Sequence, residues 1–378
     1  MSVKQAADLA LPHVKALAPY VPGKPIEDLA RELGLTDIVK LASNENPLGA
    51  SPKGMAAMQS AMGSLSLYPD GSAYRLRAAI ASKFGLQPDM ITVGNGSNDV
   101  LELVARAFLA QGREAVFSQH AFAVYPIITQ ATGATASVAP ALPADSSMPY
   151  GNDLQALLEQ ITKRTAVVFL ANPNNPTGTW VNQADLLAFL DKVPPTVLVV
   201  LDEAYTEYVE RPDFPNGLTL LARYPNLVVT RTFSKIYGLA GLRVGYGVSS
   251  PEIAAILNRV RQPFNVNRLA LVAAEAALDD EDFVRRSREV NTAGLAQLAQ
   301  AFAKRGMPTI PSVANFITVD VGSKALQVYE NLLKKGVIVR PVANYSLPNH
   351  LRITIGTESE NHRLLEAIDQ VMLELGDS

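Results

Sequence analysis

The chain has 378 residues, of which 48% are hydrophobic and 18% charged, a composition that excludes a disordered protein. It contains no cysteine, which excludes disulfides, thiolate nucleophiles and cysteine-ligated metal centres. The 33 basic and 36 acidic residues leave a net charge of −3 without a basic run, so we expect neither a nucleic-acid nor a membrane partner.

Short apolar runs alternate with helical stretches between about residues 40 and 265, after a helix-like opening at residues 25–33. An amphipathic helix is expected at residues 100–109. The strand-like runs are residues 90–93, 115–117, 166–170, 197–201 and 227–229. This alternation predicts a mostly parallel α/β sheet, and runs that are apolar throughout indicate helices on both of its faces.

The chain beyond residue 266 changes character. It is helical in pattern at 269–278 and 289–303 and then gives strand-like segments at 316–321, 337–340 and 351–355. We therefore expect a large domain over residues 40–265, with residues 1–39 and 266–378 forming an N-terminal arm and a smaller α+β domain. The sequence does not place the helix at 25–33 on either unit.

The strand at residues 90–93 leads into a glycine-containing turn and a helix. Gly94 and Gly96 precede Ser97 and Asn98, whose backbone N–H groups at a helix start would suit a phosphate. Asp99 stands where a dinucleotide fingerprint has its third glycine, which disfavours a nicotinamide site. A plain turn with a Ser or Asn cap explains the pattern equally well.

Polar residues also follow three other predicted strands. They are the loop at residues 171–178, Asp202, and Ser234-Lys235 with Arg243 eight residues later. A rigid loop, a core ion pair and a solvated lysine would explain them one by one. Ligands bind beyond the carboxyl ends of strands in open α/β sheets, however, so convergence on one crevice explains them together. An amine nucleophile and an anion-binding arginine would then share a site.

The order and spacing of these segments resemble the fold-type I pyridoxal-phosphate aminotransferases, and most closely the histidinol-phosphate aminotransferase family. The resemblance rests on three motifs and covers nearly the whole chain. They are Asn172-Pro-Asn-Asn-Pro-Thr-Gly178, Asp202-Glu-Ala-Tyr205, and Ser234-Lys235 followed by Gly241-Leu-Arg243. It implies an aspartate-aminotransferase-like fold with a large sheet domain and a smaller α+β domain.

The resemblance also implies catalytic roles. Lys235 would hold pyridoxal 5'-phosphate covalently and move the proton from the substrate α-carbon. Asp202 would keep the pyridine nitrogen protonated, and Asn172 and Tyr205 would hydrogen-bond the ring hydroxyl.

Further implied contacts hold the rest of the cofactor. Phe122 would stack on the ring, where many relatives have tyrosine. Tyr68 would reach the phosphate from a partner subunit, which requires a homodimer. The phosphate contacts within one chain would be Ser97, Asn98, Ser234 and Arg243.

For the substrate, Arg352 resembles the arginine that binds either the glutamate carboxylate or the phosphate of histidinol phosphate. Tyr20 and Asn172 would add polar contacts. Arg340 is either a second phosphate contact or one half of a surface ion pair. The four histidines are not spaced as metal ligands, so we expect no metal.

The expected function is a cytoplasmic, homodimeric enzyme of histidine biosynthesis that transaminates between histidinol phosphate and 2-oxoglutarate by a ping-pong mechanism. An aromatic amino-acid aminotransferase is the alternative, because Phe122, Phe264 and Tyr20 could line a pocket for a phenyl ring. A lyase or decarboxylase on the same fold, or a binding module without turnover, is disfavoured. Ile236 departs from the family's small residue after the lysine.

Overall fold

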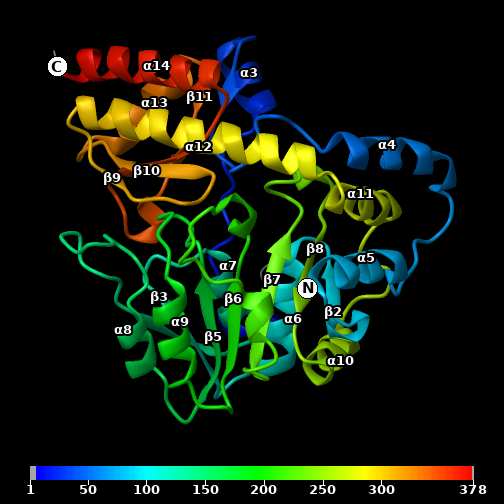
Figure 1. Cartoon of the computed structure of the whole chain (residues 1–378). Coiled ribbons are helices and arrows are strands. Elements are labelled where there is room, and N and C mark those ends of the chain that lie inside the picture. Colours follow the sequence, from blue (N-terminus) through cyan, green and yellow to red (C-terminus); the bar gives the residue numbers. More distant parts are fainter. Residues whose placement is uncertain (1–5, 377–378) are drawn as a thin grey trace.

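The structure is a computed structural model that describes residues 6–376. Its larger unit is built on a seven-stranded sheet in the order β2-β8-β7-β6-β5-β3-β4, in which only β8 runs antiparallel to its neighbours (Figure 1). The mostly parallel sheet predicted from the sequence is thereby confirmed. The strands are β2 Ile91–Gly94, β3 Glu114–Ser118, β4 Thr135–Ala139, β5 Thr165–Ala171, β6 Leu198–Asp202, β7 Leu227–Thr232 and β8 Gly245–Val248.

Helices cover both faces of this sheet, which is why its central strands are apolar throughout. Along β5, Val167 and Phe169 pack in one core with α6 and α7, while Val168 and Leu170 pack in another with α8 and α9. The helices of the unit are α4 Pro52–Ala61, α5 Tyr74–Phe84, α6 Ser97–Phe108, α7 Val124–Ala131, α8 Leu154–Glu159, α9 Gln183–Leu190, α10 Pro251–Val260 and α11 Arg268–Leu278.

The smaller unit lies above the large one in Figure 1 and contains a four-stranded antiparallel sheet in the order β12-β13-β10-β9. The α+β unit expected near the C-terminus is thus present. Its strands and helices are β9 Thr309–Ile310, β10 Phe316–Asp320, β11 Val337–Ile338, β12 Arg340–Pro341, β13 His350–Thr354, α12 Glu281–Lys304, α13 Ala325–Lys334 and α14 Glu358–Gly376.

The N-terminal segment joins the smaller unit, a placement that the sequence left open. Strand β1, Val39–Lys40, pairs in parallel with β11, and Leu29 of α3, Ile26–Leu33, packs on Ile338. Helix α2, Pro12–Lys15, lies instead beside α7 of the large unit. The short 3-10 helices are η1 Met62–Ser64, η2 Pro88–Met90, η3 Thr206–Tyr208, η4 Gly217–Leu220, η5 Ala240–Leu242 and η6 Ala343–Tyr345.

The core contacts of α11 and α12 bear on where the division between the two units lies. Residues Ala270–Leu278 of α11 belong to the core of the large unit, where α11 packs on α4 and α5. Beyond α11, the first buried residue of the small-unit core is Leu298, within the long helix α12 that runs between the units (Figure 1). We therefore propose that the domain boundary lies in α12.

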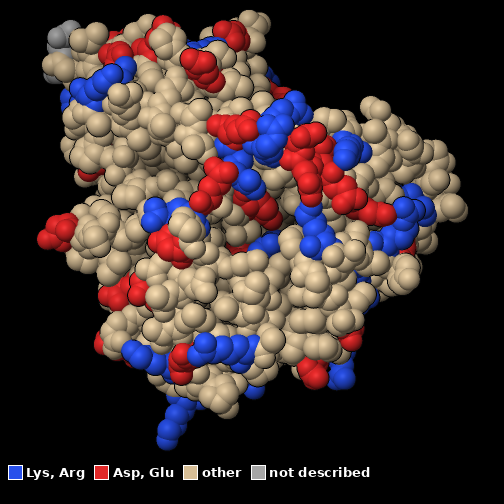
Figure 2. Space-filling model, in the orientation of Figure 1, with Lys and Arg blue, Asp and Glu red and all other residues tan. Residues whose placement is uncertain are grey.

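Within residues 6–376, no helix is both long and apolar enough to cross a membrane. Acidic and basic side chains are interspersed on the face drawn in Figure 2. The described residues contain no group of three or more His, Asp or Glu placed to hold a metal ion.

Candidate active site

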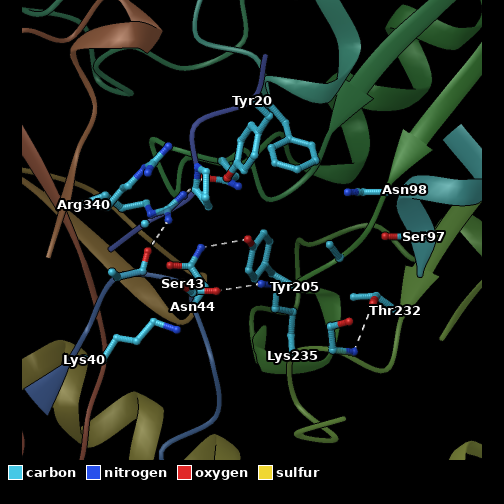
Figure 3. Close-up of a pocket in the computed structure, with 18 of the residues that line it drawn as sticks. Tyr20, Lys40, Ser43, Asn44, Ser97, Asn98, Tyr205, Thr232, Lys235 and Arg340 are labelled. Carbon is cyan, nitrogen blue, oxygen red and sulfur yellow. Dashed lines mark hydrogen bonds between the residues drawn. The ribbon is translucent and has the colours of Figure 1, made fainter. Parts of the chain in front are cut away.

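A cavity of about 470 Å³ lies where the carboxyl ends of the large sheet meet the smaller unit. Its walls come from the loops after β2, β3, β5, β6 and β7, from strands β12 and β13, and from residues 20–27 and 40–44. Figure 3 shows Lys235 and Tyr205 near its middle, with Ser97 and Asn98 on one side and Arg340 on the other. The convergence expected at the strand ends is therefore present.

Lys235 lies three residues beyond β7, and its amine donates a hydrogen bond to the Ser43 carbonyl at 3.1 Å. Burial of this amine, together with the positive charge of Arg352, lowers its pKa to about 7. A lysine with such a pKa is about half neutral at pH 7, so it can act as a nucleophile and a base there, unlike a solvated lysine.

Asp202 ends β6, and both of its carboxylate oxygens accept hydrogen bonds inside the cavity wall. Tyr125 donates to Oδ2 at 2.8 Å, and Thr230 donates to Oδ1 at 2.9 Å. Burial raises the pKa of Asp202, and no cationic side chain among residues 6–376 forms an ion pair with it. A cationic N–H group in the cavity would therefore suit this carboxylate.

Tyr205 places a phenol between Lys235 and the smaller unit. Its hydroxyl accepts a hydrogen bond from Nδ2 of Asn44 at 2.9 Å. Burial raises the pKa of Tyr205 to about 12, so the phenol is neutral at physiological pH and has a proton to donate.

The turn before α6 forms an anion cradle. Gly96 has a φ of +85°, and a Cβ there would lie 2.5 Å from Nη2 of Arg243. Arg243 bonds the Ser234 hydroxyl at 3.4 Å, and Ser97 at the start of α6 faces the same space. The carboxylate of Asp99 turns away, since it accepts from the backbone N–H of Asn95 and the Asn265 amide. A helix start and a guanidinium together suit a phosphate.

Two further arginines line the end of the cavity that lies opposite Arg243 and the start of α6. Arg340 on β12 and Arg352 on β13 are directly paired across the small sheet, and both are buried. Arg352 donates to Asn175 Oδ1 at 2.6 Å and to the Ala42 carbonyl at 2.7 Å. Arg340 donates to a backbone carbonyl at 2.6 Å and has no carboxylate partner among the described residues, so it is not part of a surface ion pair.

Aromatic residues flank this arrangement. The Arg340 guanidinium lies over the ring of half-exposed Tyr20, at 5.8 Å from its centroid, and Phe122 lines the cavity. Tyr68, by contrast, is 79% exposed and stacks on Phe264 at 4.7 Å, and neither residue lines the cavity of this chain.

The structure places the side chain of Asn172 in its own loop and not among the residues that line the cavity. Its amide donates to the Val181 carbonyl at 3.0 Å and accepts from the Val181 N–H at 2.9 Å, so both of its polar groups are used within the loop. Asn175 of the same loop lines the cavity instead and bonds Arg352. The sequence could not show which of the three asparagines in this turn-rich loop faces the cavity.

Other contributing residues were missed in the sequence. Thr230 lies directly opposite Asp202 in the parallel register of β6 and β7, a pairing that adjacent strands could have suggested. Tyr125 reaches Asp202 from α7, and Asn44 reaches Tyr205 from a loop. No periodicity or spacing marks these two contacts, because both join distant parts of the chain.

The chain is similar to known proteins along nearly its whole length. Residues 36–368 match the family described as aminotransferase class I and II. The chain is 59% identical to histidinol-phosphate aminotransferase 2 of Pseudomonas fluorescens, over 96% of this chain and 97% of that one. It is 54% identical to histidinol-phosphate aminotransferase 2 of Methylococcus capsulatus, over 97% and 98% of the two chains.

Among solved structures, the histidinol-phosphate aminotransferase of Sinorhizobium meliloti in complex with pyridoxal-5'-phosphate has a TM-score of 0.89. It is 29% identical and covers 97% of this chain and 98% of its own. A mutant of Thermus thermophilus aspartate aminotransferase, 22% identical with a TM-score of 0.83 over 96% and 99% of the two chains, shares the fold. The chain therefore belongs to the class I and II aminotransferase family.

Proposed function

We propose that the chain is a pyridoxal-phosphate-dependent aminotransferase that moves an amino group between histidinol phosphate and 2-oxoglutarate in histidine biosynthesis. The observation that carries this proposal is the pair of buried arginines, Arg340 and Arg352, facing one cavity with a separate phosphate cradle. One cationic end suits the cofactor phosphate, and the other suits a second anion, either the substrate phosphate or a carboxylate. The names of the relatives support the same substrate.

The donor set of the cavity fits pyridoxal phosphate. Lys235 offers a weakly basic amine for the aldehyde, and Asp202 offers a carboxylate without a cationic partner for the ring nitrogen. Tyr205 offers a proton for the ring oxygen, while the α6 start and Arg243 suit the phosphate. When bound, the cofactor supplies an electron sink for negative charge at the substrate α-carbon.

The chain's own residues supply the remaining chemistry. Nζ of Lys235, once freed by the incoming amine, would take the proton from the substrate α-carbon and deliver it to C4′ of the cofactor, and a pKa near neutrality suits both transfers. Asp202 stabilises a protonated ring nitrogen, and its bonds from Tyr125 and Thr230 hold it in place. Asn175, held by Arg352, takes the part expected of Asn172.

The aromatic alternative has less support. Phe264, one of three rings on which it depended, lies outside the cavity and stacks on Tyr68. A phenylalanine substrate has only its α-carboxylate to offer the two buried guanidinium groups at the substrate end, and its phenyl ring adds no counter-charge.

We also propose a homodimer in which Tyr68 completes the phosphate cradle of the partner. The exposed side chain of Tyr68 stands in an apolar group with Leu65, Leu67 and Tyr74, all at least 60% exposed. Such a group suits a subunit interface. A reaction that uses glutamate and 2-oxoglutarate is expected in the cytoplasm.

Substrate preference tests the proposed function. We expect wild-type kcat/KM for histidinol phosphate to exceed that for phenylalanine by at least about a hundredfold, because a phosphate carries more charge and more acceptor oxygens for the two arginines than the single carboxylate of phenylalanine. Arg340→Gln should lower kcat/KM for histidinol phosphate by about ten- to a hundredfold, the worth of a charged hydrogen bond. The phenylalanine value should change little.

The control is Arg285→Gln, which removes an exposed arginine of α12 that pairs only with acidic neighbours on its own helix. It should leave both values unchanged. A wild-type preference for phenylalanine would contradict histidinol phosphate as substrate.

A further inference from the structure

Residues 42–44 hold three proposed active-site side chains in succession. The carbonyls of the first two accept from Arg352 at 2.7 Å and from Lys235 at 3.1 Å. The amide of Asn44 donates to the Tyr205 hydroxyl at 2.9 Å, as Figure 3 shows. This segment connects β1 of the smaller unit to the large unit, so it can relate the two halves of the site.

The smaller unit fixes the orientation of the Asn44 side chain. The Thr354 hydroxyl on β13 accepts from the Asn44 backbone N–H at 2.8 Å and donates to Asn44 Oδ1 at 3.2 Å. Asn315 donates to the Asn44 carbonyl at 2.9 Å. Because Oδ1 of Asn44 is held by the Thr354 hydroxyl, Nδ2 of Asn44 is the amide atom that faces Tyr205. The residue has a φ of +56°, a left-handed conformation that asparagine tolerates better than most residues.

This bond sets the direction of the Tyr205 proton. An amide nitrogen only donates, so the phenol oxygen is the acceptor in the bond from Asn44. Among residues 6–376, no acceptor is paired with the phenol proton, and the side chain lines the cavity. The proton is therefore available to a ligand atom in the cavity.

We propose that Asn44 is a positioning residue that directs the Tyr205 proton into the cavity. Thr354 of the smaller unit holds the Asn44 side chain in the orientation that this requires. The inference rests on the proposed function, since the acceptor it implies is the ring oxygen of the cofactor. With the donor in place, negative charge on that oxygen is stabilised, and the nitrogen shared by Lys235 and the cofactor releases its proton more readily.

The test is the pH midpoint of the visible absorption change of the holoenzyme, measured without substrate. Asn44→Gly removes the amide and keeps the left-handed backbone accessible. We expect it to raise the midpoint by about one pH unit, a tenfold change in proton affinity. Tyr205→Phe should give a similar rise, and adding Asn44→Gly to Tyr205→Phe should raise it no further.

Two more variants distinguish the loss of the Asn44 amide from a general loss of order in the loop at residues 42–44. Asn315→Ala loses a buried amide that holds the same loop but keeps the bond to Tyr205, so its midpoint should equal that of wild type. Thr354→Val should give part of the rise and decides the question if Asn44→Gly does not fold.

An unchanged midpoint in Asn44→Gly would overturn the inference, as would an equal rise in the Tyr205→Phe background or in Asn315→Ala. An unchanged midpoint in Thr354→Val would also overturn the inference. A wild-type protein that gives no cofactor band after addition of pyridoxal phosphate would instead refute the proposed function.

Discussion

The protonation of Lys235 is set by the fold before any ligand binds. Burial of the amine, with Arg352 on the facing strand, lowers its pKa to about 7. Asp202 is shifted in the opposite sense, because burial raises its pKa by more than the hydrogen bonds from Tyr125 and Thr230 lower it. A neutral amine and a carboxylate that lacks a cation are the complementary groups that a protonated pyridine aldehyde needs.

The lowered pKa of Lys235 predicts how the apoprotein takes up pyridoxal phosphate. Only the neutral amine attacks an aldehyde, so the capture rate should rise with pH up to about 7 and then level off. An unperturbed lysine would give a rate that keeps rising toward pH 10. Stopped-flow absorbance across pH 5.5–9 would distinguish the two profiles, with Lys235→Ala as the control that shows no capture.

Among the elements, the turn between β2 and α6 has a backbone that leaves little room for a side chain. Gly96 combines a positive φ with close contact to the Arg243 guanidinium, and a Cβ on Gly245 of β8 would lie 2.4 Å from the Ser97 nitrogen. The cradle therefore depends on two glycines that let a strand, a helix start and an arginine approach one another.

Gly96→Ala should weaken pyridoxal-phosphate binding at least about tenfold, because it displaces Arg243 and with it about one charged hydrogen bond to the phosphate. The matched control is Gly112→Ala. Gly112 has a φ of +88° but nothing within 4 Å of the added Cβ, so it shares the backbone strain without the contact. Equal dissociation constants for the two variants, measured by fluorescence titration of the apoproteins, would contradict this role.

Strand ends were the most predictable part of the site. Asp202, Ser234 and Lys235 follow apolar runs that the sequence marks clearly, and parallel strands must bring their carboxyl ends to one edge. Side-chain direction within a loop was not predictable, as the exchange between Asn172 and Asn175 shows. It depends on hydrogen bonds to residues that only the fold brings near.

Tertiary packing explains the other difference. Helix α11 was expected in the smaller unit because the helical pattern of residues 269–278 comes after the change in character at residue 266, yet its alanine-rich face packs on α4 and α5. Helical periodicity shows which face is buried, but it does not show against which partner.

In the whole molecule, the two units contribute different charges to one cavity. The large unit supplies the amine, the carboxylate and the phosphate cradle, while the smaller unit supplies both arginines of the substrate end. Neither unit alone contains both anion sites, so the proposed chemistry depends on the way the two are joined.

The proposed dimer predicts the outcome of mixing two inactive variants, Tyr68→Ala and Lys235→Ala. If Tyr68 serves the partner's cavity, a mixed dimer has one site with both lesions and one with none. Random pairing of equal amounts should therefore restore about a quarter of the wild-type sites. No recovery after subunit exchange would show that Tyr68 acts on its own chain or not at all.

The most direct test of the central claim is the visible spectrum of the purified holoenzyme before and after each amino donor, without any acceptor. We predict that the band of the lysine-bound cofactor disappears with glutamate and, in a fresh sample, with histidinol phosphate, while Lys235→Ala fails to complete either conversion. A band that disappears with glutamate and phenylalanine but persists with histidinol phosphate would contradict the proposed substrate. The absence of any cofactor band after reconstitution would contradict the account as a whole.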